Sequence, residues 1–309
     1  MLTPARFRVL AAVTALFAYL QITLGGLVRV SGSGLGCPDW PTCYGRPYPP
    51  LNLHAIIEYS HRTVGAITGL LIIATVVVAF LTFRGRRSPV NWLTLATLGT
   101  VIIEGLLGGL VVRTELQPVL VLVHLGIAML ILAFMIAAAL LAEPVLGSPS
   151  TGAIGRLLPV ALVLTYLMLL TGSSVVASGA DDVCRSWPLC GNGFQPDFTG
   201  VASFAMLHRF TVGVVALLLL HVLSLALRRH RSVRGVGPVA GATIALLIVQ
   251  IAIGALTAVN ANVAALQGLH LAFGSGTWAG MVALTVLIRR PALRAAGDGP
   301  ALALERGAA

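Results

Sequence analysis

The heptapeptide CPDWPTC at residues 37–43 returns 147 residues later as CRSWPLC at residues 184–190. The same offset places Tyr19 on Tyr166, upstream of the heptapeptide in each copy. A period of this length is too long for a solenoid repeat, and it indicates a duplicated unit whose two copies build the same structure. The chain is therefore expected to consist of two similar halves.

Composition places both halves in a membrane. Hydrophobic residues make up 57% of the chain and charged residues 10%, and the mean hydropathy is +0.95. These values lie far outside the range of soluble globular domains. Apolar stretches long enough to cross a bilayer recur eight times. The predicted spans are Val9–Val28, Ala55–Phe83, Asn91–Val112, Val119–Ala142, Leu157–Val176, Val201–Leu227, Val239–Val259 and Ala264–Ile288.

Four of these spans fall in each half, so both halves begin and end on the same side of the membrane. The duplication is then parallel rather than inverted. The predicted fold is an all-α polytopic membrane protein made of two four-helix bundles, one in residues 1–145 and one in residues 146–291. The tail, residues 292–309, is rich in Ala, Gly and Arg and is predicted to be disordered.

Arginines gather on one side of the predicted spans, and the positive-inside rule makes that side cytoplasmic. These residues are Arg6, Arg8, Arg84, Arg86, Arg87, Arg156, Arg228, Arg229, Arg231, Arg234, Arg289, Arg290 and Arg294. The pattern predicts a multi-pass protein of the cell membrane with cytoplasmic N- and C-termini. Because the net charge of +10 reflects this topology, we expect no nucleic-acid partner.

The four cysteines fall together on the outer side, one pair in each heptapeptide. An exported location permits disulfides, and a short proline-containing loop can bring each pair within bonding distance. The alternatives are a thiolate metal site, for which the gap within each pair is wider than usual, and a redox-active dithiol. The sequence favours a structural disulfide in each loop, Cys37–Cys43 and Cys184–Cys190.

Four histidines occupy repeat-related positions inside apolar spans. His61 matches His208 at the offset of 147, and His124 matches His270 at an offset of 146. Each lies within about the first two turns, or roughly 10 Å, of a span that enters from the outer side. A single histidine of this kind is best explained by a helix cap or a bundle hydrogen bond. Four at matched depth indicate ligation, because ionisable groups inside a membrane are costly and usually functional.

The missing donors identify the ligand. Each half supplies one clear pair of imidazoles, whereas a zinc or copper site usually gathers a third or fourth protein donor. Two axial histidines from facing helices suit a planar heme iron, and four-helix bundles often hold such a cofactor. We therefore predict one heme iron between His61 and His124 and another between His208 and His270.

Charged residues distinguish the first half from the second. Glu58, one turn before His61, corresponds to Ala205. The other differing pairs are Arg29 and Val176, Arg113 and Val259, and Glu104 and Gln250. A carboxyl beside a heme can handle protons, but Glu58 can also simply pair with Arg62 at i+4. The asymmetry favours a working first site and a supporting second site, and it leaves the role of Glu104 open.

At these positions the chain resembles the heme A synthases. The resemblance extends from about Val9 to Ile288 and rests on a combination of motifs that is specific as a set. They are RVSGSGLGCPDWPTC at residues 29–43, EYSHR at residues 58–62, His124 after an apolar run, and the echoes at Cys184, Cys190, His208 and His270. Because some members of that family lack these cysteines, the chain resembles a bacterial form that carries both pairs.

The resemblance implies an oxidoreductase that converts the methyl group at position 8 of heme O to a formyl group. The family reaction runs through successive hydroxylations with water as the oxygen source and yields heme A for terminal oxidases. Carried over by position, substrate heme would lie between His61 and His124, with Glu58 as the catalytic carboxyl. Heme b would lie between His208 and His270 and relay electrons.

Arg29 and Arg113 are candidate partners for heme propionates, because the guanidinium fork matches a carboxylate. Anchoring of helix ends at the membrane interface is the simpler alternative for both. The implied partners are heme O, the lipid bilayer, heme O synthase and the assembly of a terminal oxidase, together with an electron acceptor that the sequence does not identify.

Two other functions fit the paired histidines. A diheme b-type cytochrome in quinol electron transfer predicts two equivalent hemes and leaves the difference between Glu58 and Ala205 unexplained. A heme transporter suits parallel repeats, but it predicts a path to the cytoplasmic side, whereas all four histidines are expected near the outer face.

Overall fold

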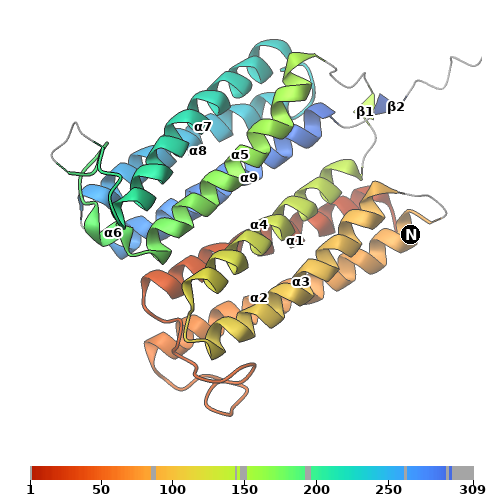
Figure 1. The fold of residues 1–309 in the computed structure, drawn as a ribbon. Helices are drawn as coiled ribbons and strands as arrows, with labels where there is room; N and C mark the ends of the chain where they lie inside the picture. Colours follow the sequence, from red (N-terminus) through yellow and green to blue (C-terminus); the bar gives the residue numbers. More distant parts are fainter. Residues whose placement is uncertain are drawn as a thin grey trace, which may run out of the picture.

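The computed structural model describes residues 2–84, 88–142, 145–146, 152–191, 196–260, 263–289 and 292–293. Within these residues, eight helices are long and apolar enough to span a membrane. They are α1 (Pro4–Val30), α2 (Leu53–Thr82), α3 (Pro89–Arg113), α4 (Pro118–Leu141), α5 (Ala153–Ala177), α7 (Ala202–Arg229), α8 (Val236–Val259) and α9 (Ala264–Arg289). The predicted helical membrane fold is confirmed, and every observed helix overlaps its predicted span (Figure 1).

Polar caps and prolines outside the apolar runs set where the helices of the first half begin. The side chains of Thr3 and Asn52 accept backbone N–H bonds at the starts of α1 and α2, and Ser88 does so for α3. Helix α4 begins at Pro118, whose ring suits the first turn. Because these residues satisfy or avoid the unpaired N–H groups of a helix start, the helices begin slightly before the hydrophobic runs.

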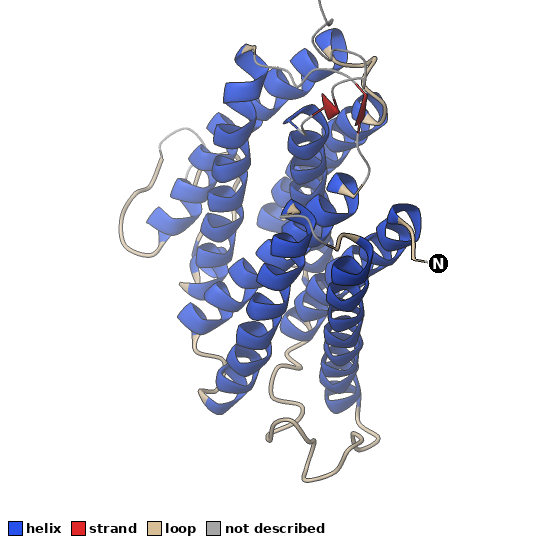
Figure 2. Ribbon diagram, turned by 90° about the vertical axis from the view of Figure 1, so that its right-hand side faces the viewer, coloured by secondary structure: helices blue, strands red, loops and turns tan. Residues whose placement is uncertain are grey.

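The helices of both halves run along a common direction, and successive spans alternate in sense (Figures 1 and 2). The N-terminus lies at one end, and the cysteine loops and the short helix α6 (Ala180–Val183) lie at the other (Figure 1). The arginines that predict the cytoplasmic side, as far as the structure describes them, lie at the end of the molecule where the N-terminus lies, as the helix bounds show. Arg86, Arg87, Arg290 and Arg294 lie outside the described residues.

The two halves meet through four helices. Helix α1 contacts α9, and α4 contacts both α5 and α9. Exchanging α1 with α5 and α4 with α9 maps this set of contacts onto itself. That is the pattern expected for parallel repeats related by an axis along the membrane normal.

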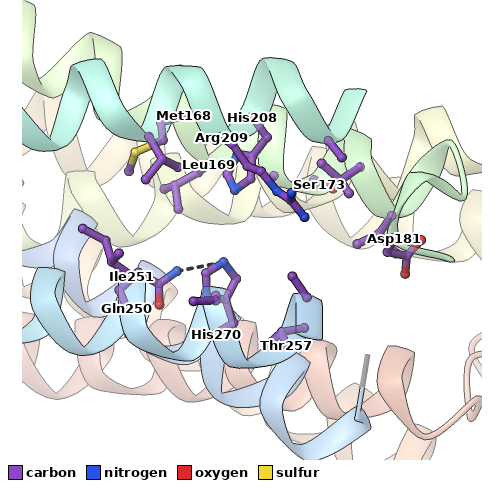
Figure 3. A pocket seen from close by; sticks show the side chains of 18 of the residues that line it. Met168, Leu169, Ser173, Asp181, His208, Arg209, Gln250, Ile251, Thr257 and His270 are labelled. Atoms are coloured by element: carbon purple, nitrogen blue, oxygen red, sulfur yellow. Dashed lines mark hydrogen bonds between the residues drawn. The ribbon is translucent and has the colours of Figure 1, made fainter. Parts of the chain in front are cut away.

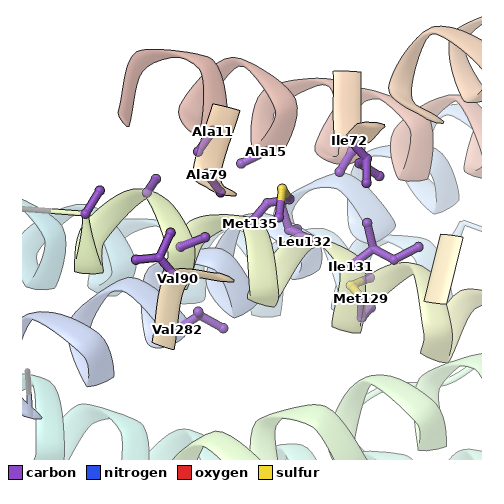
Figure 4. Close-up of a cluster of buried hydrophobic side chains, with 14 of the residues drawn as sticks. Ala11, Ala15, Ile72, Ala79, Val90, Met129, Ile131, Leu132, Met135 and Val282 are labelled. Atoms are coloured by element: carbon purple, nitrogen blue, oxygen red, sulfur yellow. The ribbon is translucent and has the colours of Figure 1, made fainter. Parts of the chain in front are cut away.

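Helix α9 also contributes to the hydrophobic core of the first half. Val282 and Trp278 join a buried cluster of α1–α4 residues that includes Met135 and Leu132 (Figure 4). The Trp278 indole N–H donates to the backbone oxygen of Met129 at 2.9 Å. A second cluster of buried side chains packs among part of α5, α7, α8 and α9. The halves are therefore packed against each other through shared side chains.

Two short strands join the segment between the halves to the start of the tail. β1 (Val145–Leu146) pairs in parallel with β2 (Ala292–Leu293). The tail predicted to be disordered therefore begins with a paired strand, because backbone hydrogen bonds to β1 can order residues whose composition alone indicates disorder. Residues 294–309 lie outside the described part of the chain.

Candidate paired-histidine sites

The second half contains a cavity of about 690 Å³ between α5, α7, α8 and α9. His208 and His270 line it from opposite walls, from α7 and α9 respectively (Figure 3). Residues of α1, including Gly26 and Arg29, complete the wall on the side of the first half. The volume lies within the usual range for cofactor pockets.

All four predicted ligand histidines pack against a glycine on a neighbouring helix. A Cβ atom built on that glycine would lie in van der Waals contact with Cε1 of the ring at Gly108 and closer than ordinary contact at the other three. The pairs and distances are Gly25 and His61 (3.1 Å), Gly108 and His124 (3.4 Å), Gly172 and His208 (3.0 Å), and Gly254 and His270 (2.7 Å). The four glycines are related by the same offsets as the histidines. Each half therefore repeats both the histidine ring and the glycine against which the ring packs, which we call its glycine seat. This is a more specific role than the close helix packing that small residues commonly serve in lipid.

Amide side chains one turn before two of these glycines contact the rings. Gln21 Nε2 lies 3.3 Å from His61 Nε2, and Gln250 Nε2 lies 3.3 Å from His270 Nε2. The amide can hold either imidazole tautomer because it presents both an oxygen and an N–H group.

The remaining two rings have different partners. Glu104 Oε1 lies 3.2 Å from His124 Nδ1, which is within ion-pair distance, although the two atoms lack hydrogen-bond alignment. Met168 stands at the corresponding position before Gly172, and Thr171 instead places its hydroxyl 3.0 Å from His208 Nδ1. Every ring is thus held from the side by a polar group.

Ring nitrogens without a protein partner are available to bind a heme iron. Nδ1 of His61 and Nδ1 of His270 are buried without a hydrogen-bond partner, and buried imidazole nitrogens normally have one. Among the described residues, no group of three or more His, Cys, Asp or Glu side chains is arranged to hold a metal ion. Paired imidazoles that pack against glycines are suited to the axial ligation of a porphyrin iron.

Both cysteine pairs form the predicted disulfides, with Cα–Cα distances of 4.7 Å for Cys37–Cys43 and 5.1 Å for Cys184–Cys190. An arginine that follows the first histidine of each half fixes the loop. Arg62 donates to the backbone oxygen of Cys37 at 3.0 Å, and Arg209 donates to that of Cys184 at 3.1 Å. Each disulfide loop is thus tied to the helix that carries the histidine.

Glu58 is part of this attachment in the first half. Its side chain is 3% exposed, accepts the Cys37 N–H at 2.8 Å and pairs with Arg62. At the matching position of the second half, Ala205 carries no such group, and the N–H of Cys184, the counterpart of Cys37, donates to the backbone oxygen of Ala180 at 3.1 Å. The structure therefore gives Glu58 the pairing with Arg62 that the sequence allowed, and it places the carboxyl one turn from His61 on the same helix.

Arg29 and Arg113, the candidate propionate contacts, lie in different places. Arg29 belongs to α1 but lines the cavity of the second half, near Asp181 of α6. Burial raises the pKa of Asp181, and the nearby Arg29 opposes that rise. Arg113 lines a smaller pocket of about 300 Å³ in the first half, beside Trp40.

Sequence reasoning missed three residues of these sites: Gln21, Thr171 and Asp181. Gln21 stands four residues before Gly25, as Glu104 does before Gly108. This shared spacing is a signal in the sequence that could have identified Gln21. No comparable signal marks Thr171 or Asp181, because their contacts depend on how α5 and α6 pack against other helices.

A duplicated eight-helix membrane protein with two repeat-related pairs of half-buried histidines is the class that this fold and these sites define. Comparison with known proteins places the chain within that class. The family model COX15-CtaA, described as cytochrome oxidase assembly protein, matches residues 8–56 and 53–282. The chain belongs to this family.

Curated relatives carry a more specific name. A protein of Symbiobacterium thermophilum named heme A synthase is 30% identical over 277 residues, covering 84% of this chain and 88% of the relative. One of Alkalihalophilus pseudofirmus with the same name is 29% identical over 301 residues, covering 93% of this chain and 98% of the relative. A third, of Exiguobacterium sibiricum, is 30% identical over 222 residues, covering 70% of this chain and 73% of the relative.

Proposed function

We propose that this protein is a heme A synthase that oxidises the C8 methyl group of heme O to a formyl group. The observation that carries the proposal is the chemical difference between two sites of the same construction. Both sites have a histidine pair packed against glycines. Among the described residues, the first site has Glu58 one turn from His61 and Glu104 beside His124, whereas Ala205 and Gln250 stand at these positions in the second site, whose cavity has its carboxyl group, Asp181, near Arg29. Membership in the family and the name shared by its relatives agree with this assignment.

In this proposal the second site holds heme b between His208 and His270. When bound, that heme supplies one-electron chemistry and relays electrons taken from the substrate. The cavity and its glycine seats support the assignment. Arg29 and Arg209 both line the cavity and are suited to bind the propionates.

The first site holds the substrate, heme O, between His61 and His124. Conversion of a methyl to a formyl group with water as the oxygen source releases electrons and protons, so the site needs a proton acceptor. We assign that role to Glu58, which is buried one turn from His61. Its contacts with Arg62 and with the Cys37 N–H hold the carboxyl in place.

The proposal includes an orientation and a setting. Arginines at the opposite ends of the helices favour cytoplasmic termini in the cell membrane, with both sites near the outer face. The product would serve the assembly of a terminal oxidase, heme O synthase would supply the substrate, and an electron acceptor would reoxidise heme b.

The test is Glu58→Gln, which keeps the shape of the side chain and removes its charge and its ability to accept a proton. The three backbone oxygens that Arg62 contacts remain, so the loop should stay attached and the protein should fold. We expect heme b to be retained and heme A production to fall at least tenfold, in line with the usual contribution of general acid–base catalysis. Glu115→Gln, which changes an exposed carboxyl on the loop between α3 and α4, is the matched control.

Chromatography of extracted hemes and the bound-heme spectrum give both readouts from one preparation. Wild-type heme A yield from Glu58→Gln would reduce Glu58 to an anchor of the disulfide loop. Loss of heme b together with activity would mark it as structural. A wild-type protein supplied with heme O that makes no heme A would instead favour a b-type cytochrome or a heme transporter.

A further inference from the structure

Glu104 and Gln250 occupy the same position in the two repeats and contact the second histidine of their respective sites. Each stands four residues before the glycine that seats the ring. Glu104 Oε1 lies 3.2 Å from His124 Nδ1, and the Gln250 amide lies 3.3 Å from His270 Nε2. The duplicated scaffold thus presents a carboxyl to one ring and an amide to the other.

The other histidine of each site has a neutral partner. His61 is held by the Gln21 amide, and His208 by the Thr171 hydroxyl. Of the four side chains that hold the rings, Glu104 alone can carry a negative charge. The carboxyl is also enclosed, because its side chain is 13% exposed and Oε2 is buried without a hydrogen-bond partner.

A carboxylate acts on a ligand histidine differently from an amide. A carboxylate within ion-pair distance of the free ring nitrogen of a metal-bound imidazole attracts the N–H proton there, which orients the ring and makes the imidazole a stronger electron donor. Stronger donation stabilises the oxidised iron relative to the reduced iron, and hydrogen bonding around the ligands is an established means of setting heme potentials.

We infer that Glu104 is a positioning residue that lowers the reduction potential of heme bound at the first site, and that Gln250 leaves the second site at a higher potential. This inference rests on the proposed function, in which both sites bind heme. It deepens that function by giving the electrons a direction. Electrons removed from the substrate at the first site would then flow toward the second site, because heme held by His208 and His270 would have the higher potential.

The alternative is a purely structural role, in which Glu104 only fills a polar gap between α3 and α4. In that case an isosteric amide at position 104 would serve equally well. The two explanations therefore differ in a measurable potential and do not depend on whether the protein folds.

The experiment exchanges the two residues, with Glu104→Gln in one variant and Gln250→Glu in the other. Purified protein that retains its second-site heme is loaded with heme O and titrated anaerobically while its optical spectrum is recorded. Glu104→Gln should raise one midpoint so that the ratio of reduced to oxidised heme at a fixed potential rises about tenfold, or ~59 mV for a one-electron couple. Gln250→Glu should lower the other midpoint. Glu115→Gln removes an exposed carboxyl and should move neither.

The outcomes separate the inference from the proposed function. If heme O binds and Glu104→Gln leaves both midpoints unchanged, the inference is overturned while the proposed function stands. If the wild-type first site takes up no heme O, both are overturned. Should Gln250→Glu fail to fold, the isosteric Glu104→Gln variant still decides the result.

Discussion

Replacing Gly254 by alanine places a methyl group against the ring of His270. A Cβ at this position would lie 2.7 Å from Cε1, 3.3 Å from Nδ1 and 3.5 Å from Nε2 of that ring. Because carbon atoms pack at about 3.5–4.0 Å, the ring has to retreat by roughly 0.8 Å. The ring and the α8 backbone are the two parts that can move, and either movement shifts the imidazole within the cavity.

The displacement is large relative to a coordination bond of about 2.0 Å between a metal and an imidazole nitrogen. Changes to the groups that orient metal-bound histidines cost about 10–100-fold in metal affinity. We therefore expect heme b to be held at least about tenfold more weakly in Gly254→Ala, within that range. The helix itself should not suffer, since alanine favours a helix interior over glycine by about 1 kcal/mol.

Gly241→Ala provides the matched control. It makes the same substitution in the same helix, and a Cβ at Gly241 meets nothing within 4 Å. Both variants gain the same helix propensity, so a difference in heme binding isolates the contact with His270. The assay is transfer of heme from each purified variant to excess apomyoglobin, with thermal unfolding measured in parallel. Equal heme retention in the two variants would refute the role of His270 as an axial ligand in the observed seat.

Two further predictions follow from the same sites. His208→Ala or His270→Ala should abolish the stable b-type spectrum of the purified protein, because either change leaves an open iron position, and a wild-type spectrum in both variants would remove the heme b assignment. Mass mapping of non-reduced peptides should find each disulfide within its own loop, and removing the Cys184–Cys190 bond should cost about 2 kcal/mol of stability with little direct effect on chemistry; free thiols, or an unchanged melting temperature, would contradict this.

The helical framework could be predicted because hydrophobic length and arginine placement are local properties of the sequence. The errors occur at helix ends. The fifth span was predicted from Leu157, after the charged Arg156, but α5 begins at Ala153. An arginine at a helix start can lie at the membrane interface, so it lowers the hydropathy without ending the helix.

The two disulfides could be predicted because each cysteine pair appears twice at one offset, and repeat-related positions likewise singled out the four histidines, whose role as heme ligands stays a prediction. Contacts between different helices could not be predicted, because they depend on the rotation and packing of each helix. Arg29 illustrates this limit: it lies at the end of a first-half helix and lines the second-half cavity, since α1 packs against α9. The local i+4 spacing of Glu58 and Arg62 left two roles open, and the structure adds the Cys37 N–H as a second partner of the carboxyl.

Comparison of the two halves separates the residues that build each site from the residues that give the two sites different chemistry. The glycine seats, the arginine that ties down each loop and both disulfides occur in each half at matching positions. The side chains near the rings differ instead: Glu58 in the first half corresponds to Ala205 in the second, and Glu104 corresponds to Gln250. Substitutions in the first group should therefore disturb heme binding in either half, because both halves use the same construction. Substitutions in the second group should change what one site does while the other keeps its heme.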